Sequence, residues 1–195
     1  MKRVAAKDLS VKPFRRASDW TAWLEQHHET SPGLWVRIGK AGSRVASVTY
    51  AEALEVALCY GWIDGQKNKH DATSWLQKFT PRGPRSLWSR INREKAEVLV
   101  RDGRMRPAGL RAIERAKASG LWDNAYDSSS QSGVPADLEA ELEKHPKAKA
   151  FFATLDRANR YAILWRLQTA KKPETRAKRL VLFVSMLTNG RRLHP

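Results

Sequence analysis

The sequence contains a single cysteine, Cys59, among its 195 residues. One thiol excludes an internal disulfide and any zinc site built from several cysteines, and this cysteine usage is typical of a reducing compartment. No apolar stretch approaches the roughly 20 residues that a membrane-spanning helix requires. The basic N-terminus is not followed by the apolar segment of a secretion signal. We therefore expect a cytoplasmic protein that is not integral to a membrane.

Acidic residues are also scarce, since 20 Asp and Glu face 36 Lys and Arg, which gives a formal net charge of +16. Residues 151–195 hold ten basic residues against Asp156 and Glu174, so this last quarter of the chain supplies a net of +8. Such a field attracts an acidic protein partner, an anionic surface or nucleic acid. The alternative interpretation is a solvated surface that keeps the protein in solution.

The motifs of several common enzyme classes are missing: GxSxG, HExxH, the P-loop and GxGxxG. Asp64 has no second carboxylate at helical or strand spacing with which to divide acid and base roles. His27 and His28 are adjacent on an expected helix, so their side chains diverge and cannot hold one metal ion. We expect no complete catalytic site, no cofactor and no metal site, and the interpretation leans against an enzyme.

Eight tryptophans and 42% hydrophobic residues indicate a sizeable core. In the first part of the chain, alternating apolar residues predict strands at 34–38 and 45–48 and an antiparallel hairpin from 62–67 and 74–79. Ser18 is expected to cap a helix before them. The run from Thr49 to Glu52 is a capping box that opens a second helix, and Gly61 ends it.

From Ser86 onward the pattern is helical, with stops at Gly103 and Gly120 and four later segments near 135–144, 146–154, 156–169 and 174–189. The predicted fold class is α+β: a helix plus a small antiparallel sheet in the N-terminal part, followed by an all-helical C-terminal bundle. The expected organisation is a flexible basic arm over 1–13, an α+β domain over 14–126, a linker over 127–134 and a helical domain over 135–195.

The densest cluster of unusual residues runs from Gly61 to Asn92. A period of two places Trp62, Asp64 and Gln66 on one face of their strand. The candidate ligand-binding residues of this region are Trp62, Asp64, Gln66, Arg82, Arg85, Trp88, Ser89 and Asn92. Two interpretations stay open: a pocket for a small anion, or fold architecture in which Trp62 is core and Asp64 pairs with Arg82.

A second candidate surface lies at the start of the last expected helix. Basic residues gather where the helix dipole is itself positive, which costs helix stability. This cost hints at an acidic partner, and the alternative is a solvated helix face. The candidate partner-binding residues are Lys171, Lys172, Arg176, Lys178 and Arg179.

Five ordered blocks carry a resemblance to a known family: Thr49–Leu54, Cys59–Gln66, Phe79–Arg82 with Ser86–Ser89, Gly103–Leu110 and Ala170–Arg176. From about Phe14 to the C-terminus, the chain resembles the YdeI/OmpD-associated, or bacteriocin-protection, family of bacterial proteins. The resemblance implies a YdeI-like first domain and an OmpD-associated second domain. It also implies a stress-linked role in resistance to bacteriocins or antimicrobial peptides, and it supplies no catalytic residues.

The strong positive charge disfavours direct capture of cationic peptides on Coulomb grounds. The function expected from the sequence is therefore that of a non-enzymatic binding or adaptor protein of the stress response. A basic nucleic-acid-binding protein is the first alternative. A small-anion-binding or enzymatic pocket in the 61–92 region is the second.

Overall fold

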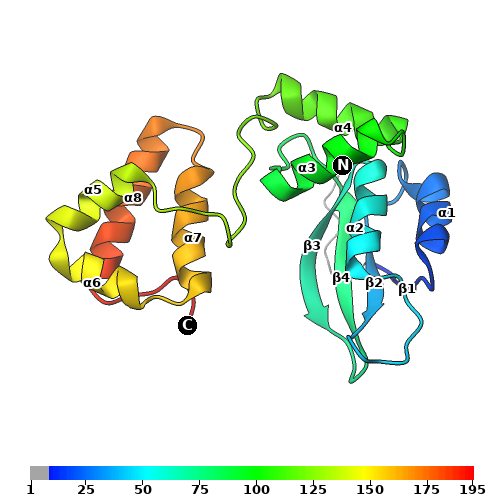
Figure 1. Cartoon of the computed structure of the whole chain (residues 1–195), viewed down its shortest axis with the longest axis horizontal. Coiled ribbons are helices and arrows are strands. Elements are labelled where there is room, and N and C mark those ends of the chain that lie inside the picture. Colours follow the sequence, from blue (N-terminus) through cyan, green and yellow to red (C-terminus); the bar gives the residue numbers. More distant parts are fainter. Residues whose placement is uncertain (1–8) are drawn as a thin grey trace. The chain divides into compact units, whose positions relative to one another are not determined.

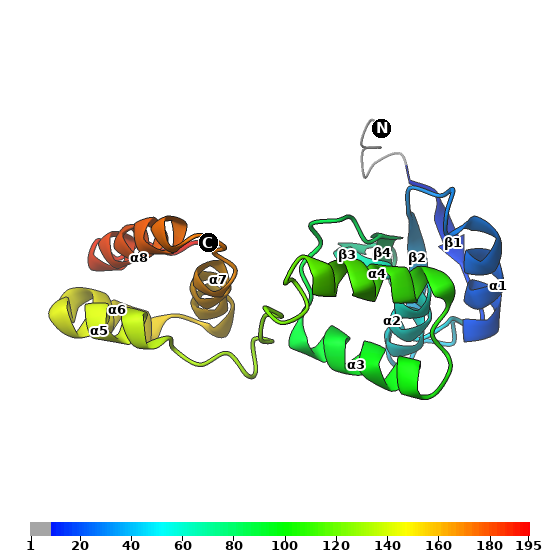
Figure 2. The ribbon, with the colours of Figure 1, turned by 90° about the horizontal axis from the view of Figure 1, so that it is seen from above.

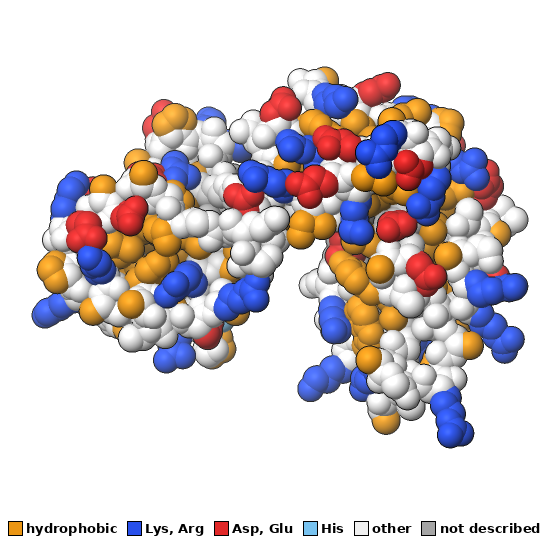
Figure 3. All heavy atoms as spheres, in the orientation of Figure 1, with side chains coloured by type: hydrophobic (Ala, Val, Ile, Leu, Met, Phe, Trp, Pro, Cys, Tyr) orange, Lys and Arg blue, Asp and Glu red, His pale blue; other side chains and the backbone are white. Residues whose placement is uncertain are grey.

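The structure is a computed structural model that describes residues 9–195. The chain divides into two compact units. Of the described residues, unit 1 comprises those up to Leu87 together with Asn92–Asp123, and unit 2 comprises Trp88–Ile91 and Asn124–Pro195. Figure 1 shows the sheet in unit 1 and four helices, α5 to α8, in unit 2. On the face seen in Figure 3, lysine and arginine side chains are scattered over both units among hydrophobic and acidic side chains.

Unit 1 contains a mixed four-stranded sheet in the order β1-β2-β4-β3. Strand β1 runs parallel to β2, whereas β2 with β4 and β3 with β4 are antiparallel pairs. The predicted strand at 34–38 and the predicted hairpin are confirmed. The bounds are β1 Val11–Pro13, β2 Leu34–Gly39, β3 Trp62–Lys69 and β4 Ser74–Pro81.

Two expectations about this sheet need correction. Residues 45–48 form no strand, because both edges of β2 are already taken by β1 and β4. Of the predicted arm, residues 1–8 lie outside the described part of the chain, and Val11–Pro13 are paired in β1 instead of frayed. The sheet is consequently mixed rather than purely antiparallel.

Helices α1 (Ala17–His27) and α2 (Tyr50–Cys59) pack on the sheet face that carries Trp62 and Phe79. Trp20 of α1 is fully buried there, with its ring 6.0 Å from Trp62 and 5.8 Å from Phe79. Its indole N–H donates to the Ala53 carbonyl of α2 at 3.1 Å. This contact satisfies a buried donor while the ring fills the core.

Local signals define α2 as expected. The Thr49 hydroxyl accepts from the backbone N–H of Glu52, and the Glu52 carboxylate accepts from the Thr49 N–H at 2.9 Å. The Thr49 N–H and the Thr49 hydroxyl both donate to this carboxylate, and these two hydrogen bonds lower the pKa of Glu52. At the other end Gly61 has a φ of +70°, the left-handed region that glycine tolerates best. The hydrogen bonds between Thr49 and Glu52 confirm the predicted capping box, and Gly61 ends the helix as predicted.

Two further helices complete unit 1: α3 (Arg90–Arg101), which belongs to this unit from Asn92 onward, and α4 (Pro107–Ala118). Helix α4 packs against α2 (Figure 2). Gly109 makes this approach possible, because a Cβ at this position would overlap the Met105 sulfur and the Cys59 carbonyl oxygen. The absent side chain thus sets the distance between the two helices.

Unit 2 buries one apolar cluster that all four of its long helices share. The largest of its fully buried side chains are Leu138, Ile163, Leu167 and Leu187. The helix bounds confirm the four predicted segments: α5 Ala136–Lys144, α6 Pro146–Thr154, α7 Arg157–Gln168 and α8 Pro173–Thr188. Among residues 9–195, no helix is both long and apolar enough to cross a membrane.

Buried Asn159 of α7 holds the last residues of the chain, Leu193 and His194, against the helices of unit 2. Its side-chain oxygen accepts from the backbone N–H groups of Leu193 and His194 at 3.1 and 2.9 Å. Its amide donates to Asp156 and to the His194 carbonyl. The serine-rich stretch 127–134 also lies in unit 2, where Asp127 accepts from Gln168 at 2.9 Å.

One ion pair joins the first and last helices of unit 2. The Arg176 guanidinium donates to both carboxylate oxygens of Asp137 at 2.7 Å, and this hydrogen bonding lowers the pKa of Asp137. The side chains are 31% and 39% exposed, so solvent limits the stabilisation to about 1 kcal/mol or less. Because the pKa is lower in the folded state, this contribution is present above the ordinary carboxyl pKa and disappears as pH falls through the lowered one.

We therefore expect Asp137→Asn to lower the melting temperature of unit 2 at pH 7 by about 4 °C. The difference between variant and wild type should shrink as pH falls through the lowered pKa of Asp137 and vanish below it, where the wild-type carboxyl is also protonated. Melting followed by circular dichroism across this pH range measures it. Glu139→Gln, an exposed neighbour in α5, is the control for charge alone. An equal loss at both ends of the pH range would contradict the assignment.

Candidate functional site

The candidate residues at the start of β3 have separate roles in unit 1. Trp62 is only 1% exposed, and its indole N–H donates to the His28 carbonyl at 3.1 Å. Asp64 accepts from the Tyr50 hydroxyl at 2.8 Å. Trp62 therefore belongs to the core, as the fold-architecture interpretation predicted. Asp64 is hydrogen-bonded to Tyr50, which lies at the start of α2.

A β-bulge separates Gln66 from the face that it was expected to share with Trp62 and Asp64. Asp64 lies opposite Phe79, but Lys67 lies opposite Gln77, so the register shifts between them. The extra residue reverses the alternation of side chains along the rest of β3. The Gln66 side chain is exposed and accepts from the Lys78 ammonium at 3.2 Å.

The remaining candidates divide between the two units. Arg82 is buried, and its guanidinium donates to the Leu87 carbonyl at 3.1 Å. Asn92 is buried at the start of α3, whereas Arg85 lies in the loop before it. Trp88 and Ser89 belong to unit 2, where the Trp88 carbonyl accepts from the Tyr126 N–H at 2.9 Å. A ligand site formed by all eight residues stays a prediction.

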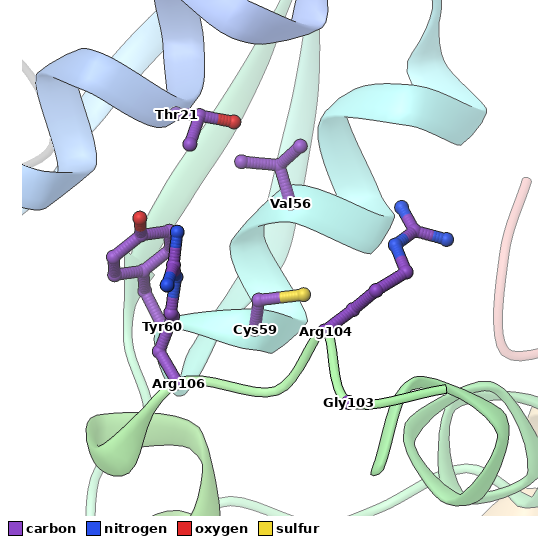
Figure 4. A pocket seen from close by; sticks show the side chains of 7 residues that line it. All are labelled: Thr21, Val56, Cys59, Tyr60, Gly103, Arg104 and Arg106. Atoms are coloured by element: carbon purple, nitrogen blue, oxygen red, sulfur yellow. The ribbon is translucent and has the colours of Figure 1, made fainter. Parts of the chain in front are cut away.

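A pocket of about 240 Å³ lies in unit 1 where α2 ends. Figure 4 shows Cys59 and Arg104 on one side and the Tyr60 ring beside Arg106 on the other. Backbone geometry builds it, because the Arg106 N–H donates to the Cys59 carbonyl at 3.1 Å and holds the α3–α4 loop against α2. The lining residues are Thr21, Val56, Cys59, Tyr60, Gly103, Arg104 and Arg106.

The thiol and the phenol in this pocket are both held in their neutral forms. Burial raises the pKa of Cys59, and the nearby guanidinium groups of Arg104 and Arg106 only partly oppose this shift. Burial, followed by the hydrogen bond to Glu25, raises the pKa of Tyr60 to about 12. A protonated thiol is a poor nucleophile, so Cys59 fits a structural role here.

The two arginines of the pocket also have carboxylate partners. Arg104 lies 3.3 Å from Glu55, and Arg106 lies 3.8 Å from Glu25. The positive charge inside the pocket is therefore largely compensated, and the arrangement suits a small polar ligand better than a highly charged one. Sequence reasoning missed Arg104 and Arg106, although both lie in one of the segments that carry the family resemblance.

The candidate basic residues of unit 2 are used in two different ways. Arg176 is bound to Asp137 and to the Leu167 carbonyl, and Arg179 donates to the Arg166 carbonyl. These two arginines stabilise the bundle. The three lysines, in contrast, have exposed side chains.

Helix α8 also exposes two adjacent apolar residues, Val181 at 71% and Leu182 at 61%. They lie three and four positions after Lys178, which places all three on one side of the helix. We call Lys171, Lys172, Lys178, Val181 and Leu182 the α8 surface. Within the described residues, no group of three or more His, Cys, Asp or Glu is placed to hold a metal ion.

Comparison with protein families matches each unit separately. Residues 132–190, within unit 2, match the family described as bacteriocin-protection, YdeI or OmpD-associated. Residues 12–112 match a family described as a domain of unknown function, DUF8412. Since this second match spans more than half of the 195 residues, the chain belongs to the DUF8412 family.

The resemblance to the YdeI/OmpD-associated family is thus confirmed for the C-terminal helices, which include the block Ala170–Arg176. The blocks between Thr49 and Leu110 fall in the stretch that matches DUF8412 instead. Neither the comparison with curated proteins nor the comparison with solved structures gave a match to this chain.

Proposed function

We propose that this protein acts in bacteriocin protection as a binding protein, and that unit 2 associates with an acidic protein partner through the α8 surface. The observation that carries the proposal is the exposure of Val181 and Leu182 next to the exposed Lys178, on a helix whose start carries the exposed Lys171 and Lys172. Single exposed apolar residues are ordinary. Two adjacent branched side chains, both more than half exposed and flanked by one sign of charge, are typical of an interaction surface.

The charge of this region supports an acidic partner. Residues 151–195 carry a net charge of +8, and Glu174 is the only acidic residue within α8. Lys171 and Lys172 precede the positive end of the helix dipole, which makes their position unfavourable in the isolated unit. An approaching acidic surface relieves this repulsion and speeds association.

The proposal is tested by bacteriocin survival of a bacterial strain that lacks the gene and is complemented at equal expression. We expect the wild-type chain to restore survival, and Lys178→Glu and the double variant Val181→Ser/Leu182→Ser to restore at most about a tenth of it, the effect of losing roughly 1.4 kcal/mol of association free energy. Lys147→Glu, an exposed lysine of α6, makes the same change of charge away from the α8 surface and should behave as wild type.

Two results would overturn the proposal. Deletion of the gene without any change in survival would remove the link to protection. Equal effects of Lys147→Glu and Lys178→Glu would show that overall charge matters and that the α8 surface does not. Circular dichroism of each purified variant excludes unfolding as the cause.

A further inference from the structure

The turn end of the β3–β4 hairpin forms an open hollow of about 820 Å³ in unit 1. This volume lies within the range of small-molecule sites, roughly 300–1,000 Å³. Its walls combine positive charge with one aromatic ring, and they lie far along the chain from the α8 surface. The residues on which the argument rests are Lys40, Lys67, Lys69, Asp71 and Trp75.

The bulge in β3 brings these lysines to the aromatic ring. After the register shift, Lys67 lies opposite Gln77 and Lys69 lies opposite Trp75. Directly opposed residues of an antiparallel pair share one face, so both lysines flank Trp75. The buried Gln77 holds the bulge, because its amide donates to the carbonyls of Gly65 at 3.0 Å and Gln66 at 3.3 Å. With unbroken alternation, two uncharged side chains would occupy this face instead.

The one carboxylate that lines the hollow is engaged by its own turn. Asp71 accepts from the backbone N–H groups of Thr73 and Ser74 at 2.8 and 2.6 Å and from both hydroxyls. The Lys40 ammonium donates to the Asp71 and Ala72 carbonyls, which holds its charge at the rim. Three ammonium groups therefore face one occupied carboxylate. Figure 3 shows lysine and arginine side chains projecting around this end of unit 1.

The aromatic part of the hollow is accessible. Trp75 is partly exposed, with the Lys67 ammonium 4.2 Å from its ring centroid and the Tyr50 ring 6.1 Å away. Tyr50 is itself 38% exposed. An aromatic platform flanked by lysines stacks a flat base and neutralises the adjoining phosphates. The bases of a duplex are already stacked on one another and cannot use such a platform.

We propose that this hollow binds single-stranded nucleic acid, with a base stacked on Trp75 and backbone phosphates at Lys67 and Lys69. On binding, Lys67 exchanges its contact with the indole ring for a phosphate oxygen. The proposal concerns unit 1 and is independent of the association proposed for unit 2. The two fail or succeed separately, because their variants lie in different units.

Binding is measured with the full-length chain by fluorescence anisotropy of a labelled oligothymidine of about 15 nucleotides, the upper range of one single-strand site. We expect the logarithm of affinity to fall linearly with the logarithm of salt concentration, and Lys67→Gln/Lys69→Gln to reduce that slope by about 1.4, or about 0.7 for each lost phosphate contact. Lys171→Gln/Lys172→Gln, which removes the same charge from the α8 surface, should leave the slope unchanged.

Stacking is tested with two substitutions at one position. Trp75→Leu should weaken binding at least about fivefold, because the platform for one base is lost, while Trp75→Phe should retain most of the affinity. A duplex of the same length should bind more weakly than the single strand. The proposal is overturned by absence of binding at low salt, by equal effects of the two lysine pairs, by preference for the duplex, or by equal affinity for polyglutamate.

Discussion

Replacement of Trp62 by alanine is expected to lower the free energy of unfolding of unit 1 by about 3 to 5 kcal/mol. Trp62 is 1% exposed and lies against Trp20 and Trp23, whose rings are 6.0 and 5.9 Å away. The substitution opens a cavity in this aromatic cluster and leaves the His28 carbonyl without its indole donor. Trp62, a candidate ligand-binding residue in the sequence, would thus be shown to stabilise the core of unit 1.

Cys59 provides a measurement specific to this unit. It is the only cysteine of the chain and is buried in unit 1, so thiol labelling during denaturant titration reports the opening of unit 1 alone. Gln66→Ala is the control on the same strand. Its side chain is exposed, and the free energy should change by less than about 0.5 kcal/mol. Unchanged labelling of Trp62→Ala would refute the core assignment.

Gly109→Ala is expected to destabilise unit 1 by about 1 to 3 kcal/mol. Helix propensity alone predicts the opposite sign, because alanine is favoured over glycine in a helix interior by about 1 kcal/mol. Here the new methyl group would meet the Cys59 backbone carbonyl and the Met105 sulfur. The sulfur moves with its flexible side chain, but the carbonyl belongs to α2, so the two helices must separate.

The matched control for this substitution is Gly133→Ala. No atom lies within 4 Å of a Cβ at Gly133, and its φ is outside the left-handed region. The change should therefore be neutral or stabilise the chain by up to about 1 kcal/mol through the entropy of the unfolded state. Thermal melting measures both variants, and Cys59 labelling adds a measurement of Gly109→Ala that is specific to unit 1. A gain in stability for Gly109→Ala would show that α4 does not pack closely on α2.

Local sequence patterns predict the residues of one proposed binding surface but not those of the other. The lysines of the α8 surface are visible in the sequence as a basic run, and helical spacing places Lys178 beside Val181 and Leu182. For the hairpin hollow, strict alternation places Lys67 on the wrong face of β3. Only the bulge, held by Gln77 from the neighbouring strand, turns it toward Trp75.

The sequence by itself determined the secondary structure where the stabilising partners are close along the chain. Thr49 caps α2 through Glu52, three residues away, and Pro107, Pro146 and Pro173 each occupy the first turn of a helix. Such signals act within four residues and need no knowledge of the fold. The periodic spacing of apolar residues is also a local signal, and together with the caps it predicted the α+β front part, the helical bundle and the β3–β4 hairpin.

Tertiary structure alone decided the pairings between distant segments. Strand β1 exists because β2 offers it an edge, Asp64 accepts a hydrogen bond from Tyr50, 14 residues earlier, and Arg176 is neutralised by Asp137, 39 residues earlier. The energy of each contact depends on the path of the intervening chain, and many partners of similar chemistry are available. The sequence shows which charged residues are present, whereas the packing of distant segments decides which residue each of them contacts.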